Sequence, residues 1–261
     1  MKLAVSGKGG VGKTFVAAGL AYFLAKKGFK VLAIDADPTP NLALTLGVRY
    51  EEANRIVPIS ENQRLISEKT GAGFGGVYRL TFTVDDIVRD FSYLSPLGVS
   101  LLVMGTVRSA GSGCMCPANA VIRALLRHLI VERDEAVVID MEAGIEHFGR
   151  GTAEHVDVML GVADSSLKAL ETVKRVSRLA FDMGVAHMFL VGNKVYSQED
   201  RARIERFASE ASLEVLGLIP YDEKIVEADR LGESPFLCTG DSFAVQALMK
   251  IGERLLDTAQ P

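Results

Sequence analysis

The chain has few of the residues from which disulfide-rich, histidine-ligated or membrane-spanning proteins are built. It holds 3 cysteines and 4 histidines among 261 residues, and so few cysteines make no disulfide scaffold. The histidines have no spacing typical of a metal site. No apolar run approaches the roughly 20 residues of a membrane-spanning helix. These absences argue against a disulfide scaffold and a membrane span, and they leave His147 as the one histidine worth testing as a ligand.

A bias of charge is also missing. The formal net charge is −4, with 24% charged and 48% hydrophobic residues, as in ordinary globular proteins. Such a balance gives no overall attraction to nucleic acid or anionic membrane, although it does not exclude a local basic patch. The glycine-rich stretch that begins at Gly7 leaves no room for an apolar leader. We therefore expect no signal peptide and a cytoplasmic location.

The glycine-rich stretch itself is the most informative feature. Residues 7–14 read Gly-Lys-Gly-Gly-Val-Gly-Lys-Thr, between an apolar run and a helical pattern. Glycines let several backbone N–H groups converge on a phosphate, and the helix adds the positive end of its dipole. Lys13 would reach the β- and γ-phosphates, and the Thr14 hydroxyl would ligate Mg²⁺. Lys8 is one lysine more than phosphate binding requires. Its ammonium would either lie beside the phosphates or point outward to a nucleotide held by a second copy of the chain.

A dinucleotide site is the alternative for this stretch. It also fits Gly-x-Gly-x-x-Gly, and Asp35 lies at about the distance expected of a ribose-binding acid. Lys13 and Thr14 favour a nucleoside triphosphate, because a dinucleotide pyrophosphate needs neither an ammonium nor a Mg²⁺-ligating hydroxyl there.

Short β-type runs alternate with helical patterns along the chain. The predicted strands are 2–5, 30–34, 100–104, 136–139, 156–162, 187–191 and 213–218, and the predicted helices are 13–27, 118–133, 166–183, 198–211 and 242–257. This alternation predicts an α/β fold with a mostly parallel sheet, helices on both faces and ligands at the carboxyl ends of the strands. We expect 1–261 to form a single domain with an irregular elaboration at about 47–97, which either binds a partner or is a plain surface insertion.

Acidic residues follow two of the predicted strands. Asp35 and Asp37 offer one carboxylate to hold a Mg²⁺-bound water and one to orient the attacking water; an Asx turn is the alternative. The apolar run 136–139 delivers Asp140 toward Mg²⁺. The segment 140–151 would then act as a switch that senses the γ-phosphate.

Two later turns are predicted to hold the base. The amide of Asn193, followed by Lys194, suits the N6 and N7 edge of adenine, with a turn-forming asparagine as the alternative. The turn that contains Tyr221 would close the other side. The predicted nucleotide-binding residues are Gly9, Gly10, Val11, Gly12, Lys13, Thr14, Phe15, Asn193, Lys194, Pro220, Tyr221 and Asp222.

A cysteine pair is the second informative feature. Cys114 and Cys116, in a loop before a predicted helix, are poorly placed for an unstrained disulfide. A helix N-terminus favours the thiolate, which binds metal. Two thiolates leave a tetrahedral site half filled, so a metal ion would be shared between two copies of the chain. Buried structural cysteines or a redox pair are the alternatives. We expect Cys238 to be an inert core residue.

Together these residues resemble the deviant-Walker-A ATPases, the group of MinD, ParA and the nitrogenase iron protein. Within that group they resemble the CooC-type ATPases, which assist nickel insertion into carbon monoxide dehydrogenase. The resemblance covers essentially the whole chain. It rests on residues 7–14 with Lys8, on Asp35-Ala-Asp37-Pro38, on Cys114-Met-Cys116 and on the run 140–147. The first two are shared across the group, and the last two indicate the CooC type.

The resemblance implies an ATPase with a MinD-like fold that dimerises around ATP. Lys8 would contact the partner subunit's nucleotide, Lys13 would hold the phosphates and Asp37 would be the hydrolytic carboxylate. Asp35 and Asp140 would support Mg²⁺ together with Thr14.

The resemblance further implies that Cys114 and Cys116 bind one metal ion at the dimer interface, Ni²⁺ in function with Zn²⁺ as the alternative. The client would be carbon monoxide dehydrogenase or the related acetyl-CoA synthase. Neither nucleic acid nor stable membrane insertion is expected. Phe15 departs from the group, which has a second threonine there; the lost hydroxyl predicts weaker nucleotide binding.

Two other functions remain as alternatives. A MinD- or ParA-like positioning ATPase would need a basic amphipathic tail to bind membrane, whereas the charges of the predicted helix 242–257 cancel and its apolar stripe is typical of core packing. An iron–sulfur reductase like the nitrogenase iron protein would use four cysteines from two copies. Residues 142–145 contain no cysteine, where the nitrogenase iron protein has its second cluster ligand, which argues against that role.

Overall fold

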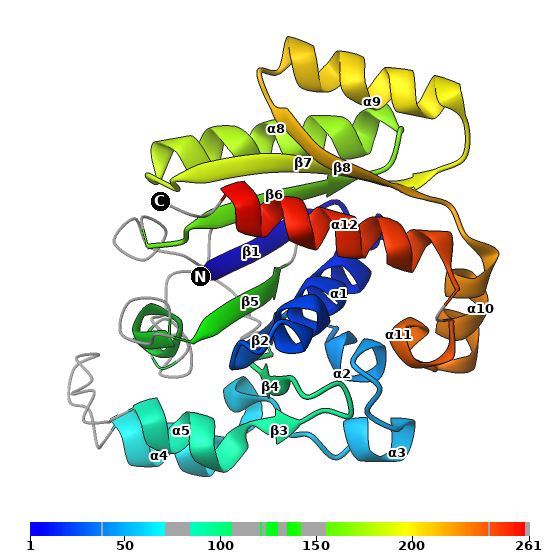
Figure 1. Ribbon diagram of the computed structural model, residues 1–261. Helices are drawn as coiled ribbons and strands as arrows, with labels where there is room; N and C mark the ends of the chain where they lie inside the picture. The colour runs from blue at the N-terminus through cyan, green and yellow to red at the C-terminus, as the bar shows by residue number, and fades with distance from the viewer. Residues whose placement is uncertain are drawn as a thin grey trace.

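An eight-stranded sheet runs through the part of the chain that the computed structural model describes, residues 1–37, 39–70, 84–105, 121, 124–129, 135–141, 155–239 and 241–258 (Figure 1). The strand order is β3-β4-β2-β5-β1-β6-β7-β8. Only the pairing of β3 with β4 is antiparallel among the described strands. The strands are β1 (Lys2–Gly7), β2 (Val31–Ala36), β3 (Tyr93–Leu94), β4 (Ser100–Val103), β5 (Ala136–Met141), β6 (Val158–Ala163), β7 (His187–Val195) and β8 (Glu214–Pro220).

Helices lie in most of the described connections between strands, as parallel pairing requires. They are α1 (Lys13–Lys26), α2 (Leu42–Thr45), α3 (Tyr50–Ala53), the 3₁₀ turn η1 (Ile59–Glu61), α4 (Gln63–Thr70), α5 (Val84–Phe91), α8 (Leu167–Asp182), α9 (Gln198–Glu210), α10 (Glu223–Leu231), α11 (Pro235–Cys238) and α12 (Phe243–Thr258). Residues 124–129 are also helical.

The predicted α/β fold is confirmed, and all seven predicted strands are present. The eighth strand, β3, was missed because two residues carry no readable alternation. Strand β7 runs four residues beyond its predicted end at Val191. Helices α2, α3, α4, α10 and α11 were also missed. The elaboration at about 47–97 contains α3, η1, α4, α5 and β3 in its described part.

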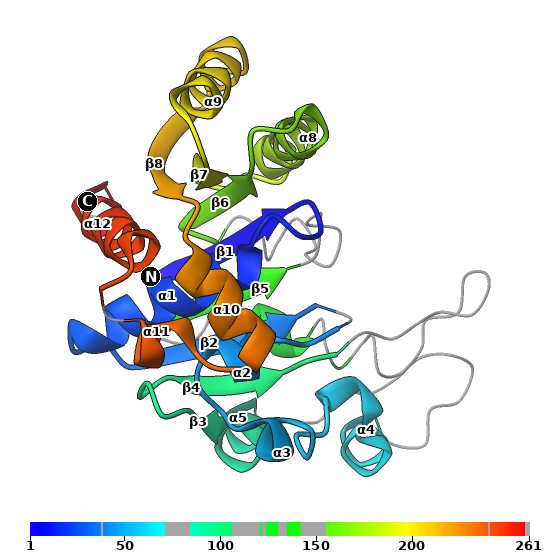
Figure 2. The same ribbon diagram turned by 90° about the vertical axis from the view of Figure 1, so that its right-hand side faces the viewer.

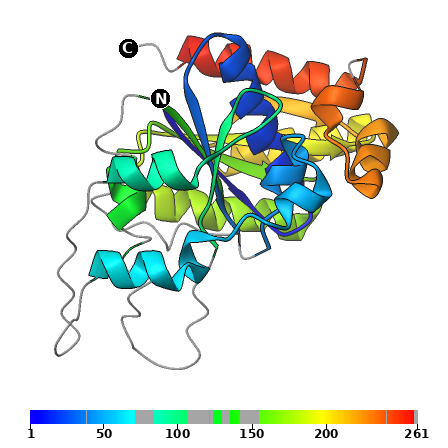
Figure 3. The same cartoon turned by 90° about the horizontal axis from the view of Figure 1, so that it is seen from below.

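Helices cover both faces of the sheet (Figure 2). Helices α1 and α12 lie on one face, while α8 and α9 lie on the other. The side chains of β1 alternate between two buried apolar clusters, since Leu3 and Val5 belong to one and Ala4 to the other. Figure 3 shows α4 and α5 near one end of the molecule and α10 with α11 at the other.

Glycines allow α1 and α12 to pack closely. A Cβ at Gly19 of α1 would overlap Leu248 of α12, and a Cβ at Gly252 of α12 would overlap the ring of Phe23. Leu248 and Leu255 are fully buried, so the apolar stripe of α12 packs into the core as predicted. In the described ranges, no helix has the length and apolar character to cross a bilayer.

Candidate nucleotide site

A cleft of about 600 Å³ lies at the carboxyl ends of the parallel strands. Its walls come from the loop after β1, from α2, from the ends of β7 and β8, and from α10 and α11. Predicted site residues that line it are Gly9, Gly10, Gly12, Lys13, Thr14, Phe15, Asp37, Asn193, Lys194, Pro220, Tyr221 and Asp222. Segments predicted to hold the phosphates, the catalytic acid and the base therefore share one cleft, although 213 positions separate Gly9 from Asp222.

The phosphate loop adopts backbone conformations that only glycine takes readily. Gly10 has φ 83° and Gly12 has φ 92°. A Cβ at Gly12 would in addition overlap the side-chain nitrogen of Asn193. Helix α1 begins directly after Gly12, and no side chain caps its N-terminus. Its first N–H groups and the positive end of its dipole are thus available for an anion.

Lys13 is 7% exposed and lines the cleft floor. Lys8 stands outside it and is exposed. No hydrogen bond or ion pair joins the Lys8 side chain to any residue that the structure describes. The two lysines of the loop therefore face different environments: one is turned into the cleft and the other toward solvent.

Asp35 and Asp140 lie behind the loop as register partners on the adjacent strands β2 and β5. Asp35 is fully buried and accepts hydrogen bonds from the backbone N–H groups of Asp37 at 3.1 Å and Leu42 at 2.9 Å. Burial raises the pKa of Asp35 to about 6, against those two hydrogen bonds.

Asp140 is 1% exposed, and neither of its carboxylate oxygens has a hydrogen-bond partner among the described residues. Burial, reinforced by the charge of Asp35, raises the pKa of Asp140 to about 7. The nearby Thr14 hydroxyl and Lys13 ammonium oppose this rise. Buried carboxylate oxygens without donors, next to a hydroxyl, are the hard ligands that Mg²⁺ prefers. These residues fit that ion.

Asp37 forms the Asx turn that was one of its two predicted alternatives. Its Oδ1 accepts a hydrogen bond from the Thr39 N–H at 2.9 Å, which is an Asx turn. Its side chain also lines the cleft. The Asx turn is therefore present and leaves the carboxylate at the cleft, while the catalytic role of Asp37 stays a prediction.

Asn193 and Lys194 contact the phosphate loop. The Asn193 amide donates to the Val11 carbonyl at 2.8 Å, and the Lys194 ammonium donates to the Gly10 carbonyl at 2.8 Å. Asn193 is 5% exposed. Its predicted contact with adenine stays a prediction, whereas its contact with the loop was not foreseen.

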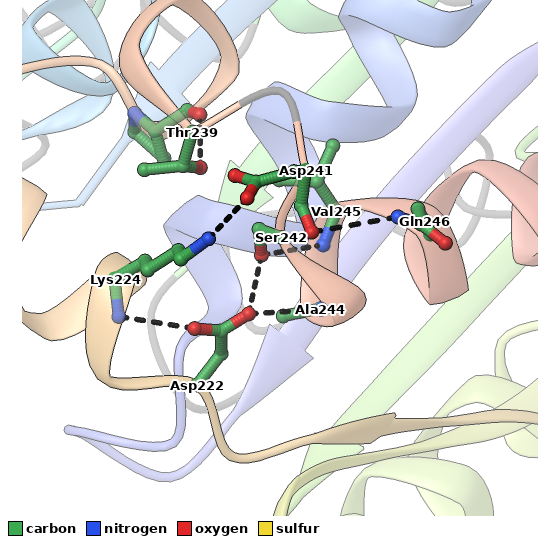
Figure 4. Close-up of polar contacts among 9 residues, drawn as sticks. Asp222, Lys224, Thr239, Asp241, Ser242, Ala244, Val245 and Gln246 are labelled. Atoms are coloured by element: carbon green, nitrogen blue, oxygen red, sulfur yellow. Dashed lines mark hydrogen bonds and ion pairs between the residues drawn. The ribbon is translucent and has the colours of Figure 1, made fainter.

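Asp222 was expected to close the base site, but its carboxylate is already engaged (Figure 4). Its Oδ1 accepts a hydrogen bond from the Lys224 N–H at 3.0 Å, and this bond caps the N-terminus of α10. Its Oδ2 accepts hydrogen bonds from the Ser242 hydroxyl at 2.7 Å and from the Ala244 N–H at 3.4 Å. Burial opposes the charge, but these hydrogen bonds outweigh it and lower the pKa of Asp222. Asp222 thus ties α10 to the start of α12 at the edge of the cleft.

Phe15 takes the place of the expected threonine for a packing reason. Its ring stacks on Phe236 of α11 with centroids 5.3 Å apart and an interplanar angle of 11°. Phe15 is 9% exposed. The departure from the family pattern therefore ties the first turn of α1 to α11, which is a wall of the cleft.

Sequence reasoning missed other residues at the cleft. Asn41 and Thr45 line it from α2, and a four-residue helix leaves no periodic signal. Tyr196 stacks on Tyr221 with centroids 4.1 Å apart; its position two residues after Lys194 was the available signal. Cys238 was predicted to be core, which is wrong: it is exposed, because it ends a short helix whose buried side is formed by Pro235 and Phe236.

The cysteine pair Cys114–Cys116 and Pro38 lie outside the described residues, as do residues 142–151 of the predicted switch. Within the described ranges, no group of three or more His, Cys, Asp or Glu side chains is placed to hold a metal ion.

Comparison with known proteins agrees with this geometry. Residues 2–236 match the family model for the CobQ/CobB/MinD/ParA nucleotide-binding domain. An uncharacterized ATP-binding protein of Methanocaldococcus jannaschii is 45% identical, with 96% of each chain covered. The carbon monoxide dehydrogenase accessory protein CooC of Rhodospirillum rubrum is 45% identical over 90% of this chain and 89% of its own.

Solved structures show the same fold. MinD of Aquifex aeolicus matches with a TM-score of 0.68 and 23% identity, covering 100% of this chain and 99% of its own. A ParA-family ATPase of Chlorobium tepidum matches with a TM-score of 0.71 and 17% identity, covering 97% and 98%. The chain therefore belongs to the CobQ/CobB/MinD/ParA nucleotide-binding family and is an ATPase of the CooC type.

Proposed function

We propose that this ATPase is an accessory protein of carbon monoxide dehydrogenase that binds nickel between two copies of the chain. One observation carries the client: the R. rubrum relative, 45% identical over 90% of this chain, is named as an accessory protein of that enzyme. Acetyl-CoA synthase, a related nickel enzyme, is the alternative client. We further propose that residues 1–261 act as one domain, with the elaboration at about 47–97 as part of it.

The nucleotide would lie along the cleft. Lys13 and the N–H groups at the start of α1 bind the β- and γ-phosphates, and Asp37 orients the attacking water. Thr14, with Asp140 and Asp35 behind it, would hold Mg²⁺, which neutralises charge on the phosphate oxygens.

Lys8 supports the proposed dimer. The lysine is exposed at the mouth of the loop, and its side chain has no partner among the described residues. In the proposed arrangement the Lys8 ammonium reaches the γ-phosphate held by the second copy. The contribution of Lys8 to stabilising the charge that develops in the transition state is thereby made only in the dimer.

The metal would be cargo rather than a resident cofactor. Cys114 and Cys116 supply two thiolates, and a second copy supplies the other two of a four-sulfur site. ATP binding closes the dimer and brings the pairs together, while hydrolysis opens it and releases the ion to the client. This proposal rests on the sequence of the pair.

A double variant tests the metal site, and the chain offers a matched control. Cys114→Ala with Cys116→Ala is expected to abolish nickel binding in equilibrium dialysis and to leave basal ATP hydrolysis unchanged. Cys238→Ala removes the third cysteine, which is exposed, and is expected to keep nickel binding. Stoichiometric nickel binding by the double variant would rule the site out.

A MinD-like positioning role is less well supported. The apolar side chains of α12 at Leu248, Ile251 and Leu255 are buried against the sheet, so they are not available to a membrane surface. Co-sedimentation with anionic liposomes or DNA in the presence of ATP tests this alternative, and the nickel-binding ATPase is expected to remain in the supernatant.

A further inference from the structure

The end of β7 departs from regular strand geometry next to the nucleotide cleft. Gly192 pairs with Leu218 and Val195 pairs with Pro220, so β7 has one more residue than β8 between these two pairs. That extra residue makes a β-bulge. Within it, Lys194 has φ 56°, a left-handed backbone that residues other than glycine adopt rarely.

The bulge turns two consecutive side chains onto the phosphate loop. The Asn193 amide donates a hydrogen bond to the carbonyl of Val11, and the Lys194 ammonium donates one to the carbonyl of Gly10, each with a donor–acceptor distance of 2.8 Å. A trans peptide points its N–H away from its carbonyl. The bond from Asn193 to Val11 therefore turns the N–H of Gly12 away from β7. The orientation of the loop peptides is thus set from the end of a different strand.

The same segment supports the opposite end of the cleft. The ring of Tyr196 stacks on that of Tyr221 with centroids 4.1 Å apart and an interplanar angle of 19°. The Tyr221 N–H also donates to the Val195 carbonyl at 3.0 Å. Tyr221 lines the cleft, whereas Tyr196 is 68% exposed on the far side of the stack.

We propose that the segment 193–196 is the positioning element of the nucleotide site. Lys194 sets the phosphate loop for the triphosphate, and Tyr196 holds the ring of Tyr221 against the base. Both are positioning residues, since neither touches the bond that is broken. The two ends of a nucleoside triphosphate are then positioned by neighbouring residues at and just after the end of β7.

Two ligands distinguish the effect of the Lys194 contact from that of the Tyr196 contact. ATP carries a base and tripolyphosphate does not. Lys194→Asn removes the ammonium but keeps a residue that tolerates left-handed backbone. Because Lys194 acts on the loop, this variant is expected to weaken the binding of magnesium-ATP and of magnesium-tripolyphosphate by the same factor, about tenfold, in titration calorimetry.

Tyr196→Leu removes the stack and leaves the loop contacts in place. It is expected to weaken ATP binding by about threefold to tenfold and to leave tripolyphosphate binding unchanged. The unchanged ligand also reports that the variant is folded, which a general loss of structure would not permit.

Two controls complete the test. Lys194→Arg keeps a cationic donor and is expected to bind both ligands about as tightly as the parent chain. Tyr50→Leu removes another exposed tyrosine, 62% exposed and not part of the cleft lining, and is expected to change neither affinity. The proposal is overturned if Tyr196→Leu weakens both ligands equally, if Lys194→Asn weakens ATP alone or leaves both unchanged, or if Lys194→Arg behaves like Lys194→Asn.

No arm of this test involves nickel or a client enzyme. Its failure would leave the proposed accessory function in place, and failure of the nickel experiment would leave this inference in place.

Discussion

Asp35 and Asp140 are register partners on the adjacent strands β2 and β5, two buried carboxylates near the Lys13 ammonium. Burial raises their pKa values to about 6 and about 7, and the charge of Asp35 adds to the rise at Asp140. Such a pair favours the binding of a divalent cation, because the cation attracts both carboxylates and offsets the repulsion between them.

This pair predicts a pH dependence of stability. In the unfolded chain both carboxyls ionise near pH 4, whereas in the folded chain they ionise at about 6 and 7. The folded state therefore binds protons more tightly. Its stability is greatest below about pH 4 for these groups and falls by a few kcal/mol as the pH rises to about 7.

Chemical unfolding without nucleotide or Mg²⁺ checks this dependence. Asp140→Asn is expected to reduce the fall between pH 5 and 7 by about half, because one of the two groups no longer ionises. If the stability of the parent chain instead rises between pH 5 and 7, as it would for carboxylates in salt bridges, the raised pKa values of Asp35 and Asp140 are contradicted.

Gly12 is predicted to be essential to the site for a steric reason. Gly12→Ala places a methyl group on the side-chain nitrogen of Asn193 and strains a backbone with φ 92°. We expect it to abolish nucleotide binding and to lower the free energy of unfolding by about 2 kcal/mol.

Gly28 provides the matched control. Its φ is 90°, but a Cβ there meets nothing within 4 Å. Gly28→Ala is expected to carry the backbone cost of about 1 kcal/mol alone and to leave nucleotide affinity unchanged. Equal effects of the two variants on affinity would contradict the proposed overlap with Asn193.

Substitution of Lys8 is predicted to affect the rate of ATP hydrolysis, and substitution of Lys13 the affinity for ATP. Lys8→Ala is expected to bind ATP nearly as tightly as the parent chain but to lose about 100-fold or more in hydrolysis rate, because the proposed contact is made across the dimer. Lys13→Ala is expected to lose binding itself. Fluorescent-nucleotide titration and phosphate release measure the two quantities; a Lys8 variant that hydrolyses ATP normally would remove the support for catalysis across the dimer.

Phe15 is predicted to act on stability more than on affinity. Phe15→Thr supplies the hydroxyl that the family pattern has, but it removes a buried ring stacked on Phe236. We expect the free energy of unfolding to fall by about 3 kcal/mol, measured by denaturant titration. Phe236→Leu is the comparison: it keeps the Phe15 ring and is expected to cost less. A Phe15→Thr chain as stable as the parent would show that the stack carries little energy.

Local patterns predicted the parts of the molecule that local chemistry determines. The loop 7–14 carries its glycines and lysines in sequence, and apolar runs mark the buried strands that deliver Asp35 and Asp140. A parallel sheet then brings strand ends together, which is why Asn193 and Tyr221 reach the same cleft as predicted.

Features that depend on distant packing were not readable. Nothing near Phe15 indicates that Phe236 will stack on it, and nothing near Asp222 indicates that Ser242 will donate to its carboxylate. The bulge at Lys194 arises from the pairing of β7 with β8. The sequence of one strand contains no information on the register in which a neighbouring strand pairs with it.

The most direct test of the proposed function is the nickel stoichiometry of the protein together with its mass in solution. With a slowly hydrolysed ATP analogue and excess nickel, analytical ultracentrifugation and metal analysis are expected to find a dimer that carries one nickel ion per two chains. A chain that remains a single species of 28.1 kDa at every nickel and nucleotide concentration, or that binds one ion per monomer, would contradict the shared four-thiolate site.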